Sequence, residues 1–166
     1  MATDKKYILS KEVVEKKLRR MAFEILENNI DEKEIILAGI RESGSVVAKV
    51  IQKMLGEISS IKTELITITL DKKQPSEVSL SKKIDFNDKV IIVIDDVSNS
   101  GKTLLYALKP FIEFHPKKIQ TLVLVERTHK AFPINPDYVG LSIATTLQEN
   151  IIVQVENDEV LGAWLE

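Results

Sequence analysis

A run of five branched aliphatic residues, Val90–Ile94, ends directly in two adjacent carboxylates, Asp95 and Asp96. A strand that is apolar on both faces has to be covered on both, which is typical of a central strand in a parallel sheet. No longer apolar run occurs in the chain, and a membrane helix needs about 20 apolar residues. We therefore expect a folded domain built around this strand, with no membrane-spanning segment.

The rest of the chain alternates helical and extended patterns. Ser10 is placed to cap a helix that runs to about Asn29, and its apolar residues recur every three or four positions. A second helix should end near Gly56, and a third should begin at about Lys102 and be kinked or ended by Pro110. Further strands are predicted at Ile35–Ile40, Leu65–Leu70, Ile119–Val125, Leu141–Ala144 and Ile151–Val155. This order predicts an α/β fold with an open, mostly parallel sheet and helices on both faces.

Length and composition indicate one domain over residues 1–166. The chain has 44% apolar and 29% charged residues, and its formal net charge of −2 gives no overall attraction to nucleic acid. It has no cysteine, which excludes disulfides, thiol catalysis and thiolate metal sites. The first residues lead into no apolar stretch, so we expect no secretory signal and a cytoplasmic location.

Ligands of open α/β sheets bind outside the carboxyl ends of the strands. This rule selects three segments: Arg41–Gly44, Asp95–Thr103 and the region after Val125. The polar stretch Asp71–Lys89 is long for a connection, and loops of that length are often functional lids.

The segment after Val90–Ile94 has the composition of a phosphate-binding loop. Its residues are small or hydroxyl-bearing, and they precede a predicted helix whose N-terminus favours anions. Two carboxylates before such a loop suit the hydroxyls of a ribose 5-phosphate. The plainer alternative is that Asp95 and Asp96 end a strand and Ser100 caps a helix. A P-loop is excluded, because that motif needs an earlier glycine and the region around Val97 and Ser98 contains none.

The segment around Asp95 and Asp96 resembles the signature of type I phosphoribosyltransferases. That signature consists of an aliphatic strand, two acids, a short variable stretch, and then a run that is here Ser100-Gly101-Lys102-Thr103. Residues 36–44 (ILAGIRESG) resemble the pyrophosphate loop of that family, and residues 124–130 (LVERTHK) resemble its hood segment. Within the family the chain looks most like the bifunctional pyrimidine-operon regulators that are also uracil phosphoribosyltransferases. The resemblance implies the family fold, with a small hood formed mainly by the N-terminal segment and residues 126–155.

The resemblance also implies the residue roles. Asp95, Asp96 and Arg41 would be the catalytic residues, with the two aspartates on the ribose hydroxyls of 5-phosphoribosyl-1-diphosphate (PRPP). The PRPP-binding residues would be Asp95, Asp96, Val97, Ser98, Asn99, Ser100, Gly101, Lys102 and Thr103. The pyrophosphate loop would be Arg41, Glu42, Ser43 and Gly44. A Mg²⁺ ion would bridge pyrophosphate and ribose oxygens, near Asp95 and Asp96 but with no certain protein ligand.

The residues implied at the base are Glu126, Arg127, Ile151 and Ile152. Purine-salvage members of the family typically carry a lysine where this chain has Glu126, so the resemblance favours uracil over hypoxanthine. A salvage enzyme for a different base stays open. A plainer interpretation is that Glu126 simply pairs with Arg127 or Lys130. Glu42 and Ser43 depart from the family pattern, and we expect that departure to affect turnover more than ligand binding.

A second function hypothesis is an RNA-binding, nucleotide-sensing regulator of pyrimidine genes with little catalysis. Its sequence support is the family resemblance and the basic cluster Lys16, Lys17, Arg19 and Arg20. Nearby acidic residues dilute this cluster, and a basic cluster on a helix is usually a solvated face. RNA binding is therefore not favoured, whereas the resemblance implies a homodimer.

Overall fold

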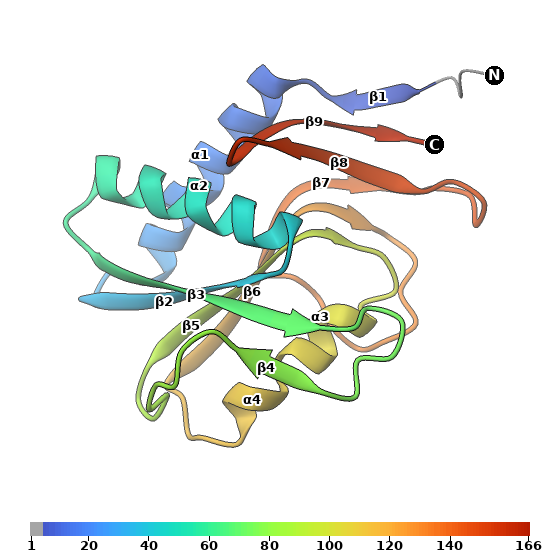
Figure 1. Cartoon of the computed structure of the whole chain (residues 1–166). Coiled ribbons are helices and arrows are strands. Elements are labelled where there is room, and N and C mark those ends of the chain that lie inside the picture. Colours follow the sequence, from blue (N-terminus) through green and yellow to red (C-terminus); the bar gives the residue numbers. More distant parts are fainter. Residues whose placement is uncertain (1–4) are drawn as a thin grey trace.

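A computed structural model describes residues 5–166 and contains a six-stranded sheet of order β4-β3-β2-β5-β6-β7. Its strands are β2 (Glu34–Ile40), β3 (Lys62–Leu70), β4 (Val78–Leu80), β5 (Val90–Ser98), β6 (Lys118–Arg127) and β7 (Tyr138–Ile143). All neighbouring strands are parallel except the edge strand β4, which pairs antiparallel with β3. The apolar strand β5 lies between β2 and β6, as its composition predicts (Figure 1).

Two helices cover each face of this sheet. Helices α1 (Lys11–Asn28) and α2 (Ser43–Ile58) pack on one face, and α3 (Lys102–Ala107) and α4 (Lys109–Ile112) pack on the other. β5 contributes to both cores: Ile92 and Ile94 face α1 and α2, whereas Ile91 and Val93 face α3 and α4. The predicted α/β class, with a mostly parallel sheet and helices on both faces, is confirmed.

Helix α1 forms where the sequence pattern predicts it. The Ser10 hydroxyl accepts a hydrogen bond from the Val13 amide at 3.3 Å, which caps the N-terminus. The apolar stripe is fully buried, and each such side chain contributes about 1.5–3 kcal/mol by leaving water. Its members are Val14, Leu18, Met21 and Ile25.

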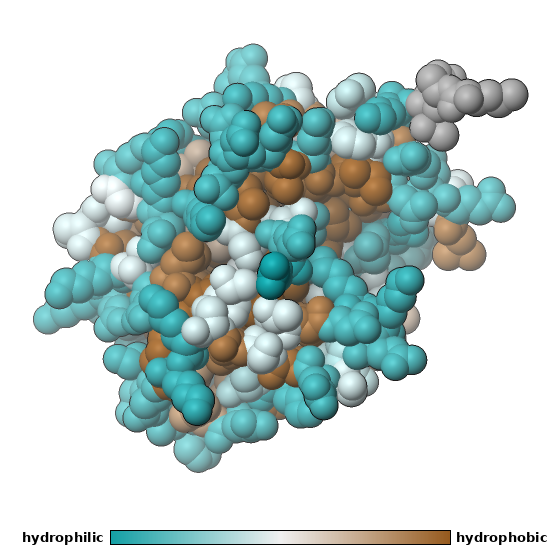
Figure 2. Space-filling model, in the orientation of Figure 1, coloured by the Kyte–Doolittle hydropathy of each residue, from teal (hydrophilic) through white to brown (hydrophobic). Residues whose placement is uncertain are grey.

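A separate three-stranded antiparallel sheet has the order β1-β9-β8, with β1 at Lys6–Leu9, β8 at Ile151–Glu156 and β9 at Glu159–Leu165. Asn157 and Asp158 connect β8 to β9 in a two-residue turn with φ values of 51° and 59°. Only β8 is predicted from the sequence, so β1 and β9 are additions. Hydrophobic residues on the face shown in Figure 2 gather over α2 and this small sheet, and hydrophilic residues cover most of the rest.

The expected lid at 71–89 is largely part of the fold. Strand β4 lies within it, and Phe86 is buried against Phe111 of α4 with ring centroids 4.9 Å apart. The connections outside the strands are the hairpin loop 71–77 and residues 81–89, which include Phe86. The helix predicted from Lys102 divides into α3 and α4, with Pro110 in the first turn of α4. None of the helices within residues 5–166 is long and apolar enough to cross a membrane.

Candidate functional site

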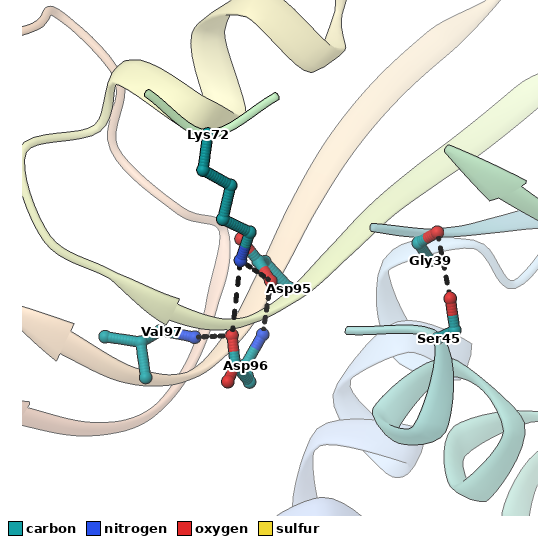
Figure 3. A network of polar contacts seen from close by, with 6 residues as sticks. All are labelled: Gly39, Ser45, Lys72, Asp95, Asp96 and Val97. Carbon is teal, nitrogen blue, oxygen red and sulfur yellow. Dashed lines mark hydrogen bonds and ion pairs between the residues drawn. The ribbon is translucent and has the colours of Figure 1, made fainter. Parts of the chain in front are cut away.

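The acid pair lies at the carboxyl end of β5, between the ends of β2 and β6. Asp95 is completely buried and points toward α2, and Asp96 is partly exposed. The Asp95 Oδ1 atom accepts a hydrogen bond from the Asp96 amide at 2.9 Å, and Asp96 Oδ1 accepts one from the Val97 amide at 2.8 Å (Figure 3). Asp95 Oδ2 has no hydrogen-bond partner among residues 5–166.

Gly44 explains why Asp95 is so deeply buried. A Cβ atom at this position would lie 2.7 Å from the Ile94 carbonyl oxygen and 3.0 Å from Asp95 Oδ1. Only glycine therefore allows the first turn of α2 to press against the end of β5. The contact brings the expected pyrophosphate loop and the acid pair together, although 50 residues separate them in the sequence.

Lys72, in the hairpin 71–77, reaches down to both carboxylates. Its Nζ atom is 3.5 Å from Asp95 Oδ1 and 3.9 Å from Asp96 Oδ1 (Figure 3). Burial raises the pKa of the Asp95 carboxyl well above its usual range, and the Asp96 charge raises it further, while Lys72 lowers it. The Lys72 side chain is 46% exposed, so water screens its charge and it offsets the burial only in part. Sequence reasoning did not identify this contact.

A cavity of about 200 Å³ opens beside the acid pair. It is lined by Lys72, Asp96, Val97, Ser98, Asn99, Ser100, Gly101, Lys102, Thr103, Leu104 and Ile151. Gly101 adopts φ = 87°, a left-handed conformation that favours glycine, and its carbonyl accepts from the Leu105 amide at the start of α3. Every residue from Asp96 to Thr103 that the sequence assigns to PRPP lines this one cavity.

Ser98 adds a second unsatisfied polar atom at the end of β5. Its hydroxyl is buried and has no partner in the described part of the chain, as is true of Asp95 Oδ2. Buried polar atoms are nearly always hydrogen-bonded. Two unpaired atoms so close together at the carboxyl end of β5 therefore need an explanation. A ligand rich in hydroxyl and phosphate oxygens would satisfy both.

The expected pyrophosphate loop leads into the N-terminus of α2, which begins at Ser43. The Arg41 amide donates to the Ile68 carbonyl at 2.9 Å, while its side chain is exposed, as is Glu42. The peptide bond between Arg41 and Glu42 is cis. The free N–H groups of the first helical turn make this a suitable place for an anion.

The four residues expected at the base are not all at the cavity. Ile151 lines it, but Ile152 pairs with Trp164 in the small sheet. Glu126 forms a 2.6 Å ion pair with Lys130, the plainer of the two interpretations of this residue. The Arg127 guanidinium donates to the carbonyl oxygens of Thr146 and Glu149, at 3.4 and 2.6 Å, and so holds the loop before β8.

Metal ligands in this region are few. Within residues 5–166, no three His, Asp or Glu side chains gather closely enough to hold a metal ion by themselves. The acid pair does supply carboxylate oxygens, which Mg²⁺ prefers, and one of them is unpaired. These residues fit a Mg²⁺ ion whose other ligands come from a bound phosphate compound.

Comparisons with known proteins agree with this geometry. The family model described as "Phosphoribosyl transferase domain" matches residues 5–159. The chain is 31% identical over 162 residues to the bifunctional protein PyrR of Haemophilus ducreyi, covering 92% of this chain and 90% of the relative. It is 32% identical over 166 residues to PyrR of Streptococcus pneumoniae strain CGSP14, covering 94% and 95%.

Solved structures show the same fold at low identity. The hypoxanthine phosphoribosyltransferase of Trypanosoma cruzi superimposes with a TM-score of 0.80 at 14% identity, over 97% of both chains. A hypoxanthine-guanine phosphoribosyltransferase of Bacillus anthracis superimposes with a TM-score of 0.76 at 19% identity, over 95% of this chain and 96% of the other.

Proposed function

This chain belongs to the type I phosphoribosyltransferase family, and we propose that it transfers the phosphoribosyl group of PRPP to uracil, releasing pyrophosphate. One observation carries the proposal: Asp96 lines a cavity together with the hydroxyl-rich residues 98–103, and the adjacent Asp95 is buried with one carboxylate oxygen unpaired. This arrangement suits a ribose 5-phosphate, with its ribose hydroxyls on the carboxylates and its phosphate on the phosphate-binding loop.

In the proposed complex, Asp95 and Asp96 accept hydrogen bonds from the ribose hydroxyls. Residues Ser98–Thr103 bind the 5′-phosphate, with the Val97 backbone completing the wall. Arg41 and the backbone of residues 42–44 bind the pyrophosphate at the start of α2. A bound Mg²⁺ ion, held beside Asp95 and Asp96, would neutralise charge on the departing pyrophosphate.

The chemical step that this arrangement supports is displacement at the anomeric carbon. A ring nitrogen of the base forms the new bond to that carbon as the bond to the pyrophosphate oxygen breaks. The transition state carries positive charge on the ribose, so the carboxylates beside the ring stabilise it. Hairpin 71–77 would exclude water, and Lys72 would leave the acid pair as the ribose enters.

Uracil is proposed because an acid, not a lysine, stands at position 126, as in the pyrimidine branch of the family. The pairing of Glu126 with Lys130 weakens a direct role for Glu126 in reading the base. Two points still support uracil. Position 126 lacks the lysine typical of purine-salvage members, and the Ile151 side chain gives the cavity an apolar surface. A cytoplasmic homodimer is proposed on family grounds.

The test is pyrophosphate release from PRPP and Mg²⁺ with a panel of bases. Uracil is expected to support faster release than hypoxanthine or guanine. Faster release with a purine would overturn the base assignment, and PRPP that does not bind at all would overturn the proposed activity.

RNA binding is the second candidate, because the PyrR relatives are named bifunctional. Against it, each basic residue of the α1 cluster has a partner within the chain. Lys17 and Arg20 donate to the carbonyls of Gly140 and Val139 at 3.0 and 2.7 Å. Lys16 pairs with Glu12, and Arg19 pairs with Glu57. A salt-sensitive, nanomolar shift of pyrimidine-leader RNA, lost in Arg19→Glu with Arg20→Glu, would establish this function.

A further inference from the structure

The phosphate-binding loop is held from outside the cavity by a second loop, which we call the clamp segment and define as residues 128–136, between β6 and β7. Two successive amides of the clamp segment, those of Ala131 and Phe132, donate to the carbonyl oxygen of Ser100 at 3.0 and 3.1 Å. The Ile134 side chain packs against Gly101, where an added Cβ would lie only 2.7 Å from its Cγ2 atom. The clamp segment therefore fixes both residues at the turn of the phosphate-binding loop.

This hold on the Ser100 carbonyl sets the direction of the next amide. The peptide bond between Ser100 and Gly101 is trans, so its C=O and N–H groups point in opposite directions. Because the C=O points at the clamp segment, the Gly101 N–H points away from it. The cavity is lined by Ser100 and Gly101 but by no residue of the clamp segment, so it lies on that other side.

Lys130 closes the clamp segment on itself. Its Nζ atom donates to Glu126 Oε1 at 2.6 Å, just before the segment begins, and to Asn135 Oδ1 at 3.0 Å, near its end. The Lys130 and Glu126 side chains are only 14% and 12% exposed, so the pair is far less screened than the surface ion pairs. Glu126 itself is the register partner of Ser98, which ties the ammonium to the strand that carries the acid pair.

We propose that Lys130 is a positioning residue for the phosphate-binding loop. Its ammonium joins the two ends of the clamp segment, and the closed segment aims the Gly101 N–H at the 5′-phosphate of the ligand. The inference rests on the proposed function, since it assigns the anion at Gly101 to a phosphoribosyl group. It also gives the Glu126–Lys130 pair a role in binding phosphate instead of reading the base.

The experiment compares two fragments of PRPP by calorimetry. Ribose 5-phosphate needs the phosphate-binding loop, whereas pyrophosphate with Mg²⁺ needs the start of α2. Lys130→Met is expected to weaken ribose 5-phosphate binding about tenfold and to leave pyrophosphate binding within about twofold. Lys130→Arg, which keeps the charge and both donors, should restore most of the affinity. Lys49→Met removes an exposed ion pair with Asp158 and serves as the matched control, with no change for either ligand.

Asn135→Ala opens only one end of the bridge and covers the case in which Lys130→Met does not fold. It should weaken ribose 5-phosphate binding about threefold. Equal weakening of both fragments, or full ribose 5-phosphate affinity in folded Lys130→Met or Asn135→Ala, would overturn the positioning role alone. Wild-type protein that binds neither ribose 5-phosphate nor PRPP would overturn the proposed function and this inference with it.

Discussion

The two ends of the main sheet both bury polar side chains, but they treat them differently. At the amino ends of β6 and β7, the Gln120 side-chain oxygen accepts from Tyr138 at 2.8 Å and from Asn29 at 3.1 Å. Lys118 donates to the carbonyl of Asn28 and the side-chain oxygen of Asn29, both at 2.9 Å, which also caps the end of α1. In this amino-end network each of these side chains has a partner.

At the carboxyl end of β5, Asp95 Oδ2 and Ser98 Oγ are buried without partners in the region that the structure describes. An unpaired buried polar atom costs about 1–3 kcal/mol, so this end gives up stability that the other end keeps. The two ends therefore have different roles. The amino-end network holds α1 against the sheet, whereas the carboxyl end leaves polar atoms free to bind a ligand.

The strongest test of this comparison removes the acid pair. Asp95→Asn with Asp96→Asn should raise the dissociation constant of PRPP about a hundredfold, from about tenfold for each carboxyl–ribose hydrogen bond lost. The unfolding midpoint should stay the same or rise, because a buried carboxyl that resists ionisation is replaced by a neutral group. Calorimetry and thermal unfolding check the two parts, and unchanged PRPP affinity would remove the acid pair from the site.

Gly101→Val affects function and fold at the same position. A left-handed conformation costs a residue with a Cβ about 1–2 kcal/mol, and the new side chain would meet Ile134. We expect ribose 5-phosphate binding to fall about tenfold or more and stability to fall as well.

Gly56→Val is the matched control for Gly101→Val. A Cβ at Gly56 meets nothing within 4 Å, so ligand affinity and stability should both be retained. If both variants bind ribose 5-phosphate normally, the phosphate site lies elsewhere.

Gln120→Leu tests the other end of the sheet. It removes the Gln120 oxygen that accepts from the Tyr138 hydroxyl, and the free energy of unfolding should fall by about 1–3 kcal/mol while PRPP affinity is unchanged. Adding Tyr138→Phe should recover part of that loss, because no buried hydroxyl is then left unpaired. Denaturant unfolding measures both changes. A loss of PRPP affinity in Gln120→Leu would show that the two ends are not independent.

The smallest expected effect is a dependence of stability on pH. Because burial raises the pKa of Asp95, the folded state holds this proton at pH values where the unfolded state has lost it. The contribution of Asp95 to stability is therefore fully present below the ordinary carboxyl pKa of about 3.9 and is lost as pH rises through the raised value. The unfolding free energy of wild type minus that of Asp95→Asn, measured over a pH series, should show this decline. A difference that rises with pH would contradict it.

Much of the fold could be predicted because buried strands and helix faces carry recognisable runs or stripes of apolar residues. The run Val90–Ile94 and the stripe of α1 are apolar whatever their neighbours, and Ser10 is a strong cap. Strand β9 has no such pattern, since Gly162, Ala163 and Trp164 become a strand through pairing with β1 and β8. One signal was available: Asn157-Asp158 between two extended segments is typical of a two-residue hairpin turn.

The candidate site divides in the same way. Residues 95–103 could be predicted because they are contiguous and follow one strand. Gly44 and Ile151 come from distant segments: the rule on strand ends selects the first and the family resemblance implies the second, whereas Lys72 is brought to the acid pair by the fold and no local pattern predicts it. The sequence predicts Lys130 only as a partner of Glu126, because the contact of residues 131 and 132 with Ser100 has no local sequence pattern.

Because β5 is a central strand, a ligand bound at its carboxyl end should slow amide hydrogen exchange along the whole strand. Its backbone is bonded to β2 on one side and β6 on the other, so its amide protons should exchange with solvent only when the whole domain opens. A ligand at 100 times its dissociation constant stabilises the closed form by about 2.7 kcal/mol, which slows such exchange about a hundredfold. Amides of Ile91–Ile94, which touch no ligand, would then record occupancy of the site as faithfully as the residues that bind it.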